Sequence, residues 1–277
     1  MIKLAADIEG IGLLGPGLDG WTGAVALLDG RTPYISQPTV LPVPEGLPPA
    51  ERRRLPRVVK LALEVGRQAT TRAGADPTGL PAVFTSSGGD GHNCHEICEA
   101  LSLDERLISP TRFHNSVHNA AAGYWSIATR STAASNALCA FDSSFSAGLL
   151  EAVTQVVVDQ TRVLLVAYDA QYPLPLFLRR PIPDAFGVAF VLAPVGVTGS
   201  SAAIPQTGAD SLGRLTVSFS DSPPDHMGHH AFESMRATIP AARSLPLLYQ
   251  LAVRKPGVVN IEYLDGRSLA VEVHPCA

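Results

Sequence analysis

The sequence predicts an α/β protein in which helices cover both faces of a largely parallel β-sheet. Segments of helical composition alternate with short apolar segments along most of the 277 residues, the pattern of such layered folds. Thr161–Tyr168 ends in a continuous apolar run, as expected of a strand covered on both faces. Ala133–Phe141 is a strand of small apolar residues that continues directly into a helix over Ser143–Val158. We expect a single domain over residues 1–277.

Local composition and turn residues predict the remaining elements. Predicted strands lie around Leu4 and at Ala24–Leu28, Pro81–Ser87, Phe186–Ala193 and Leu215–Phe219. Predicted helices lie at Ala50–Thr70, His95–Leu101, Ser116–Thr129 and Ala241–Val253. A terminal hairpin turns at Asp265 and Gly266, a pair typical of tight hairpin turns.

Composition describes an ordinary globular protein. The chain is 46% hydrophobic and 17% charged with a formal net charge of -4, which favours neither nucleic acid nor an anionic membrane surface as a partner. Its longest apolar runs, such as Val163–Ala167 and Val188–Ala193, are far shorter than the roughly 20 residues that cross a bilayer. The first residues, MIKLAADIEG, reach acidic side chains before any long apolar segment, so we expect no secretion signal. The 4 cysteines are too few for a disulfide scaffold, and we expect a cytoplasmic protein with reduced thiols.

The segment Asn136–Ala152, NALCAFDSSFSAGLLEA, is the most informative one. A strand that runs into a helix N-terminus presents the side chain at the turn, where the helix dipole and free N–H groups favour a thiolate or an oxyanion. Asp142 is the predicted N-cap of the helix. This stretch resembles the nucleophile elbow of ketoacyl synthases, in which an Ala-Cys-small-Ser-Ser pattern precedes a helix of small residues.

The elbow lacks the cysteine of that pattern. When Ser143 and Ser144 are set against the serine pair, Phe141 takes the cysteine position, and a shift by one residue brings Asp142 there instead. Neither side chain is an acyl-accepting thiol. We expect Phe141, Asp142, Ser144 and Phe145 to form a degenerate, buried elbow that lines or blocks the acyl tunnel, because a bulky side chain fills the volume of a thioester.

The resemblance covers most of the chain. Its further segments are IEGIGLLGPGLDGW, VFTSSGGDG, FHNSVHNAAAGYWSIAT, VLLVAYD and ARSLPLLYQLA. Together they are similar to the short ketoacyl-synthase-like chain length factors of aryl polyene and related polyketide systems. The resemblance implies a thiolase-like layered fold with one complete half and a reduced second half, and no cofactor. It also implies a heterodimer with an active ketoacyl synthase, whose interface helps to set acyl chain length, and transient contact with an acyl carrier protein.

The usual condensation chemistry is also incomplete after the elbow. In active synthases two histidines, in HGTGT-like and NSFGFGG-like contexts, stabilise the enolate, and neither pattern occurs in this sequence. The histidines after Cys139 are His226, His229, His230 and His274. We therefore expect no catalytic residues. Without a partner synthase, homodimerisation through about Ser135–Ala140 is the alternative assembly.

Cys139 is the main challenge to a non-catalytic subunit. It lies in an apolar strand before the elbow, so we expect it inside the sheet as a small hydrophobic residue. The rival hypothesis is an active acyltransferase or hydrolase that uses Cys139, or Ser143 and Ser144, with His118. A third hypothesis is a stand-alone acyl-binding module.

His114 and His118 are four residues apart, a spacing that on a helix places both imidazoles on one face, as a metal or acid–base pair requires. We favour structural and interface hydrogen bonding for this segment. The expected subunit interface comprises Phe113, His114, Asn115, His118, Asn119, Ser135, Asn136 and Leu138.

Two other clusters carry candidate chemistry. His92, Cys94, His95 and Cys98 could suggest zinc, but no second paired-ligand motif accompanies them, so a plain amphipathic helix is favoured. The histidines of DHMGHH are expected in a solvated loop, and we expect no metal site. The basic cluster comprises Arg52, Arg53, Arg54 and Arg57. Acyl carrier proteins are acidic, so this cluster is a candidate docking surface, and a solvated helix face is the alternative.

Overall fold

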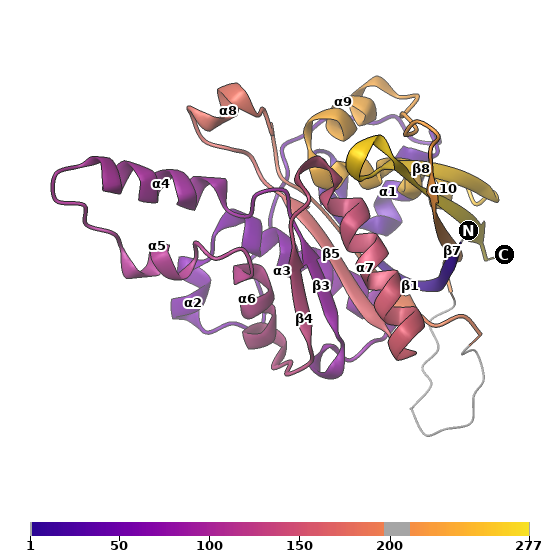
Figure 1. Cartoon of the computed structure of the whole chain (residues 1–277), viewed down its shortest axis with the longest axis horizontal. Coiled ribbons are helices and arrows are strands. Elements are labelled where there is room, and N and C mark those ends of the chain that lie inside the picture. Colours follow the sequence, from indigo (N-terminus) through magenta and orange to yellow (C-terminus); the bar gives the residue numbers. More distant parts are fainter. Residues whose placement is uncertain (1, 197–210, 277) are drawn as a thin grey trace.

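The structure is a computed structural model that describes residues 2–196 and 211–276. In these residues a nine-stranded sheet has the order β4-β3-β5-β6-β1-β7-β9-β8, with β2 paired to β1 (Figure 1). The strands are β1 (Leu4–Gly15), β2 (Leu18–Asp19), β3 (Ala82–Thr85), β4 (Ser135–Leu138), β5 (Val163–Asp169), β6 (Phe186–Ala193), β7 (Gly213–Ser220), β8 (Gly257–Glu262) and β9 (Ser268–Pro275). The alternation of strands and helices confirms the predicted α/β class.

The sheet is mainly antiparallel, so the prediction of a largely parallel sheet is wrong. Among the described strands only β3 pairs in parallel, with β4 and with β5. Residues 170–185 return the chain from β5 to β6, and a short turn joins β8 to β9. A strand buried on both faces is apolar whatever its direction. The apolar run of β5 therefore did not indicate whether the neighbouring strands are parallel or antiparallel to it.

Helices cover both faces of the sheet. The helices are α1 (Trp21–Leu28), α2 (Pro49–Arg54), α3 (Arg57–Ala73), α4 (Gly91–Ser102), α5 (Pro110–His114), α6 (Ala120–Thr129), α7 (Ser144–Asp159), α8 (Leu176–Arg179), α9 (His230–Thr238) and α10 (Leu245–Ala252). Short 3-10 turns are η1 (Pro77–Gly79), η2 (Phe141–Ser143), η3 (Pro240–Ser244) and η4 (Leu264–Gly266). One apolar core lies between the sheet and α3 with α6, and the other lies between the sheet and α7, η3 and α10.

Alternating side chains of the central strands belong to the two cores. Val83 of β3 lies in the core with Phe145 of α7, whereas its neighbour Phe84 lies in the other core with Trp125 of α6. Two glycines of β1 bring α3 close to the sheet: a Cβ on Gly12 would lie 1.9 Å from the carbonyl oxygen of Val65. The backbone of α3 therefore lies directly on the central strand.

Several predicted elements are corrected in type or in extent. The strand Phe186–Ala193 is confirmed in full, but Ala24–Leu28 belongs to helix α1, because so short an apolar run fits either structure. The predicted helix Ala50–Thr70 is divided into α2 and α3 at Leu55, which is extended because a proline follows it. The predicted helix Ser116–Thr129 begins only at Ala120.

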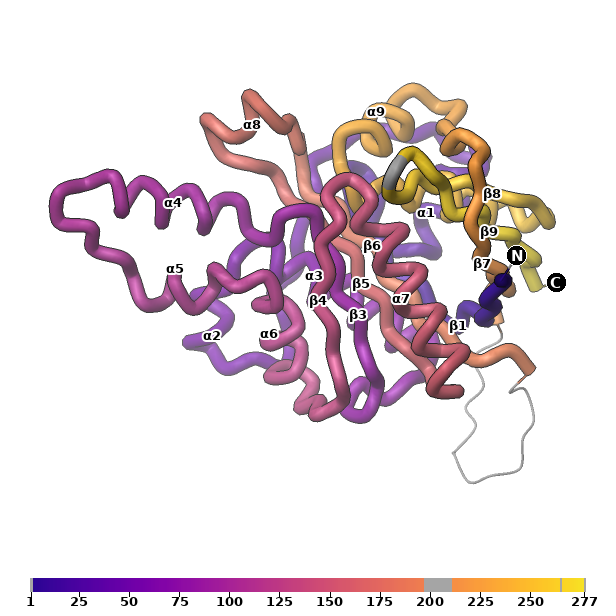
Figure 2. Tube along the Cα trace, in the orientation of Figure 1, coloured from indigo at the N-terminus to yellow at the C-terminus, as the bar shows by residue number. Residues whose placement is uncertain are grey.

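Residues 91–114, with α4 and α5, form an arm that projects from the body of the molecule (Figures 1 and 2). Only Gly91 and Asn93 of α4 are buried, and no residue of α5 is. Apolar side chains of the arm face solvent, including Leu107 at 75% exposure and Phe113 at 68%. Among the described helices, none combines the length and hydropathy that a membrane span requires.

Candidate functional site: a nucleophile elbow without a thiol

The predicted elbow lies where the chain leaves the edge of the sheet and enters α7. β4 ends at Leu138, the turn η2 follows, and α7 begins at Ser144. Phe141 has a φ of 51°, in the left-handed region that a residue with a Cβ rarely occupies. Such strain costs about 1–3 kcal/mol and persists only where surrounding contacts hold it.

Ser144 and Thr85 hold this strained turn. The Ser144 hydroxyl donates to the carbonyl oxygen of Phe141 at 2.7 Å and accepts from the backbone N–H of Ala140 at 3.0 Å. The Thr85 hydroxyl, at the end of β3, donates to the carbonyl oxygen of Ser144 at 2.7 Å. Phe145 follows as a fully buried core residue. The hydroxyl of Ser144 is therefore committed to the backbone of the elbow.

The Phe141 side chain is 64% exposed, so the prediction of a buried Phe141 is wrong for this chain by itself. The elbow follows an edge strand, and no further described strand covers that side of the sheet. The guanidinium carbon of Arg180 lies 3.8 Å from the centroid of the Phe141 ring. An arginine at this distance over an aromatic face is held by a cation–π contact.

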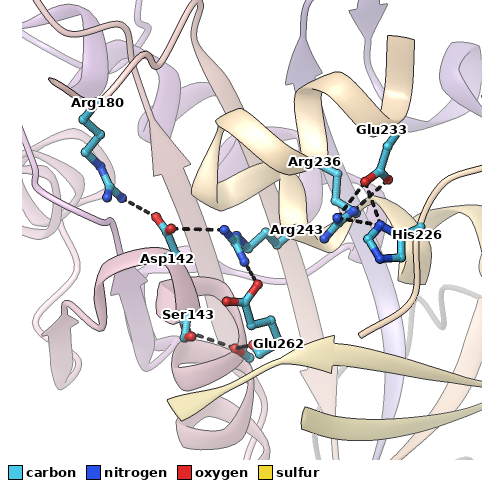
Figure 3. Close-up of polar contacts among 9 residues, drawn as sticks. Asp142, Ser143, Arg180, His226, Glu233, Arg236, Arg243 and Glu262 are labelled. Atoms are coloured by element: carbon cyan, nitrogen blue, oxygen red, sulfur yellow. Dashed lines mark hydrogen bonds and ion pairs between the residues drawn. The ribbon is translucent and has the colours of Figure 1, made fainter. Parts of the chain in front are cut away.

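Asp142 makes ion pairs and is not the N-cap of α7. Its carboxylate lies 2.5 Å from Arg180 and 3.1 Å from Arg243, and Arg243 also pairs with Glu262 (Figure 3). The helix has no side-chain cap hydrogen bond at Ser143. Charge-assisted hydrogen bonds to two guanidinium groups are stronger than one to a single backbone N–H, so the Asp142 carboxylate pairs with the arginines and does not cap the helix.

Cys139 lies beyond the end of β4 and is exposed, so its predicted burial inside the sheet is wrong. Its thiol lies 3.1 Å from the carbonyl oxygen of Ser87, and His118 Nε2 lies 3.2 Å from that of Ser86. Both candidates of the rival hypothesis therefore contact the segment after β3. No contact between Cys139 and His118 occurs among the polar contacts of residues 2–196 and 211–276.

His114 and His118 do not share a helix, which corrects the predicted pairing. α5 ends at His114, whose ring meets that of Tyr124 edge-on at 6.2 Å, and His118 follows in the turn before α6. Asn115 is buried: its side chain donates to the Arg54 carbonyl oxygen at 3.2 Å and accepts from the Tyr124 hydroxyl at 3.1 Å. Its role in the folded chain is therefore to join α2, α5 and α6.

The other predicted interface residues lie mainly on the surface. Phe113 is exposed on the arm and Asn119 is exposed just after it. Ser135 and Asn136 are exposed on β4, and Leu138 is half-buried. In the basic cluster, Arg53 and Arg54 are exposed and Arg52 is half-buried.

Arg57 departs from the rest of the basic cluster. It pairs with Asp184 at 3.3 Å and donates to the carbonyl oxygen of Thr39 at 2.9 Å. This arginine therefore anchors the chain near the start of β6.

Three of the five histidines considered as metal ligands contact carboxylates. His92 and His95 pair with Glu96 and Glu99 along α4, and His226 pairs with Glu233 at 2.8 Å (Figure 3). Within the described part of the chain, no group of three or more His, Cys, Asp or Glu side chains is arranged to hold a metal ion.

Asp169, at the end of β5, is a buried carboxylate that the sequence analysis missed. It accepts hydrogen bonds from the backbone and hydroxyl of Ser87 at 2.9 and 2.7 Å, and from the backbone N–H of Ala241 at 2.9 Å. Burial raises the pKa of Asp169 to about 6, although these hydrogen bonds oppose the shift. The sequence signal for this site was an aspartate directly after one apolar strand, together with Ser86 and Ser87 after the neighbouring strand. Asp169 thus fixes the segment that Cys139 and His118 contact.

Comparison with known proteins identifies the family of this chain. The family model "Beta-ketoacyl synthase, N-terminal domain" matches residues 31–222, more than half of the chain, and the chain belongs to this family. No curated protein sequence matches it.

Solved structures of condensing proteins have the same fold. A structure of a ketosynthase (ApeO) in complex with its chain length factor (ApeC) from Xenorhabdus doucetiae aligns with a TM-score of 0.70 at 22% identity, over 97% of this chain and 99% of that chain. The ishigamide ketosynthase/chain length factor aligns with a TM-score of 0.69 at 13% identity, over 99% and 100%. A beta-ketoacyl synthase from Burkholderia phymatum aligns with a TM-score of 0.67 at 12% identity, over 100% of both chains. These matches confirm the predicted thiolase-like layered fold.

Asp169→Asn tests the buried carboxylate. A folded-state pKa of about 6, above the ordinary value of 3.8, means that the folded protein binds the proton more tightly than the unfolded chain. The contribution of Asp169 to stability is therefore full below about pH 4 and is lost as the pH rises through about 6. In Asp169→Asn this loss, of the order of 3 kcal/mol, is absent from the pH dependence of unfolding by urea.

The matched control is Asp221→Asn, because the Asp221 side chain is 89% exposed. Its pH dependence of unfolding follows that of the original chain. The same pH dependence in Asp169→Asn as in the original chain would show that Asp169 titrates normally.

Proposed function

We propose that this protein is a non-catalytic subunit that pairs with an active ketoacyl synthase and limits the length of the acyl chain. The pathway is aryl polyene or related polyketide or fatty acid biosynthesis in the cytoplasm. The carrying observation is an elbow with a strained turn and a helix of small residues, at which Phe141 carries an exposed ring. The resemblance to ketoacyl synthases sets Phe141 at the position of the nucleophile.

The chemistry of the described residues supports a non-catalytic subunit. The Ser144 hydroxyl is engaged by backbone groups, and Asp142 is paired with two arginines. Throughout residues 2–196 and 211–276, no histidine hydrogen-bonds or ion-pairs with residues 141–144. A condensation needs a thiolate and two imidazoles at that place, and the elbow offers an aromatic ring.

Two exposed features support a partner subunit. β4 is the edge of the sheet, and an exposed edge strand is a template for pairing with another chain. The arm carries uncovered apolar side chains, among them Leu103, Leu107 and Phe113, that a partner would bury. Structures of ketosynthases with chain length factors, whose fold this chain shares, point to a ketoacyl synthase as that partner. A homodimer through the same edge is the assembly we propose when the synthase is absent.

Phe141→Ala tests the chain-length function in a complex with the partner synthase. Loss of the ring opens space at the elbow, so the products lengthen by at least one two-carbon unit or broaden in length. The measurement is mass spectrometry of the acyl products made by the co-purified complex. The control is Phe219→Ala, a partly exposed phenylalanine on β7 that we expect to leave the product profile unchanged. An unaltered profile for Phe141→Ala in an active complex would contradict the function.

The rival acyltransferase or hydrolase is tested with an acyl thioester. The isolated chain, incubated with a labelled acyl thioester and digested, should carry no stoichiometric acyl group on Cys139, Ser143 or Ser144. Because all four cysteines are exposed, alkylation by iodoacetamide does not discriminate between the hypotheses. Stoichiometric acylation that disappears in His118→Gln would establish the rival instead. A stand-alone acyl-binding module would bind lipid tightly without any synthase.

We propose that Arg52, Arg53 and Arg54 guide an acidic acyl carrier protein to the complex. The double variant Arg52→Glu with Arg53→Glu is then expected to weaken carrier-protein binding by about fivefold to tenfold, because it replaces attraction by repulsion. The control is Arg254→Glu with Lys255→Glu, two exposed residues outside this cluster. Isothermal titration with the co-purified complex measures both. Equal affinities of the two double variants would remove the docking role.

A further inference from the structure

Arg180 stacks on the Phe141 ring. Its guanidinium lies 3.8 Å from the ring centroid and at the same time pairs with the Asp142 carboxylate at 2.5 Å. The Arg180 side chain is only 19% exposed, although the ring beneath it is largely open to solvent. One side chain thus contacts two consecutive residues of the elbow and covers one face of the ring.

The backbone of Arg180 is fixed from both sides. Its N–H donates to the carbonyl oxygen of Leu176 at 3.0 Å, and its own carbonyl oxygen accepts from Ile182 at 3.0 Å. Ile182 is fully buried in the core on the α7 side of the sheet. These two hydrogen bonds therefore hold Arg180, in the connection between β5 and β6, beside the elbow.

Asp142 also connects the Arg180 guanidinium to a second arginine. Its other carboxylate oxygen pairs with Arg243, which pairs in turn with Glu262 of β8 (Figure 3). A row of alternating charges thus runs from Glu262 through Arg243 and Asp142 to Arg180. Arg180 stacks on the Phe141 ring. A planar guanidinium can stack on an aromatic face while its edge donates to a carboxylate, a combination that lysine does not reproduce.

We propose that Arg180 is a positioning residue that fixes the orientation of the Phe141 ring, and thereby sets where the growing acyl chain stops. This inference rests on the proposed function, because it gives the ring its effect on product length. Phe141 stands on a strained backbone with an exposed side chain, so the stack with Arg180 is the contact that selects its rotamer.

The first readout reports on the ring without any acyl product. The full chain, co-purified with its synthase, carries para-fluorophenylalanine at position 141, and fluorine NMR records its signal. In Arg180→Ala the signal shifts and narrows, because the ring loses its stacking partner and rotates more freely. In the matched control Arg179→Ala the signal is unchanged, because Arg179 is the exposed neighbour with no ion pair among the described residues.

The second readout is the product length made by the same complexes without the fluorine label. Arg180→Ala extends the product range by at least one two-carbon unit, and Arg179→Ala does not. Arg180→Lys, which keeps the charge opposite Asp142 but lacks the planar stack, changes both readouts in the same direction as Arg180→Ala. If Arg180→Ala cannot be isolated, Arg180→Lys takes its place in the test. A fluorine signal and a product length in Arg180→Lys that both equal those of the original chain would overturn the proposal.

The outcomes separate the inference from the proposed function. If Phe141→Ala alters product length but Arg180→Ala leaves either readout unchanged, the positioning role is wrong and the chain-length function stands. If Phe141→Ala leaves product length unchanged in an active complex, the chain-length function fails, and the role of Arg180 in product length fails with it.

Discussion

The carboxylate of Asp142 connects the elbow to the rest of the molecule. It lies between Arg180, from the connection of β5 to β6, and Arg243, from η3, and these segments are distant in sequence. Both arginines are largely buried, so the removal of Asp142 would leave two guanidinium groups without their common partner. The Asp142 side chain is 33% exposed, so the cost of breaking these pairs lies between that of a surface pair, below about 1 kcal/mol, and the about 3–5 kcal/mol of a fully buried pair. The position of the Phe141 ring depends on this arrangement.

We propose that the elbow keeps the strained turn of a condensing enzyme without its chemistry. A phenylalanine in the left-handed region is strained, and the hydroxyl groups of Ser144 and Thr85 both form hydrogen bonds that hold the turn. In an enzyme such strain exposes a nucleophile at the end of a helix. Here the same turn carries an aromatic ring that is 64% exposed, directly after the edge strand β4. That geometry suits contact with another subunit better than contact with a substrate held by this chain alone.

Local signals in the sequence were sufficient for much of the fold. The strand Phe186–Ala193 and the helix after the elbow could both be predicted from short segments. Strand direction could not, because an apolar run in a covered sheet is the same in both directions. His114 and His118 were expected on one helix, but the chain forms a turn between α5 and α6.

The contacts of the site depend on long-range structure. Nothing near Asp142 in the sequence indicates that Arg180 and Arg243 approach it, 38 and 101 residues further along the chain. The exposure of Cys139 and Phe141 follows from the place of β4 at the edge of the sheet, which a single sequence does not reveal. Asp169 was detectable only by pairing the ends of β3 and β5, since its partners Ser87 and Ala241 come from separate segments.

We propose that this chain is the silent member of a pair, and native mass spectrometry of the chain co-expressed with a ketoacyl synthase decides whether it is. We expect a complex of one copy of each chain, which makes acyl products of a length that the synthase alone does not make. A synthase that assembles with itself and makes the same products, while this chain stays separate, would rule out the pairing.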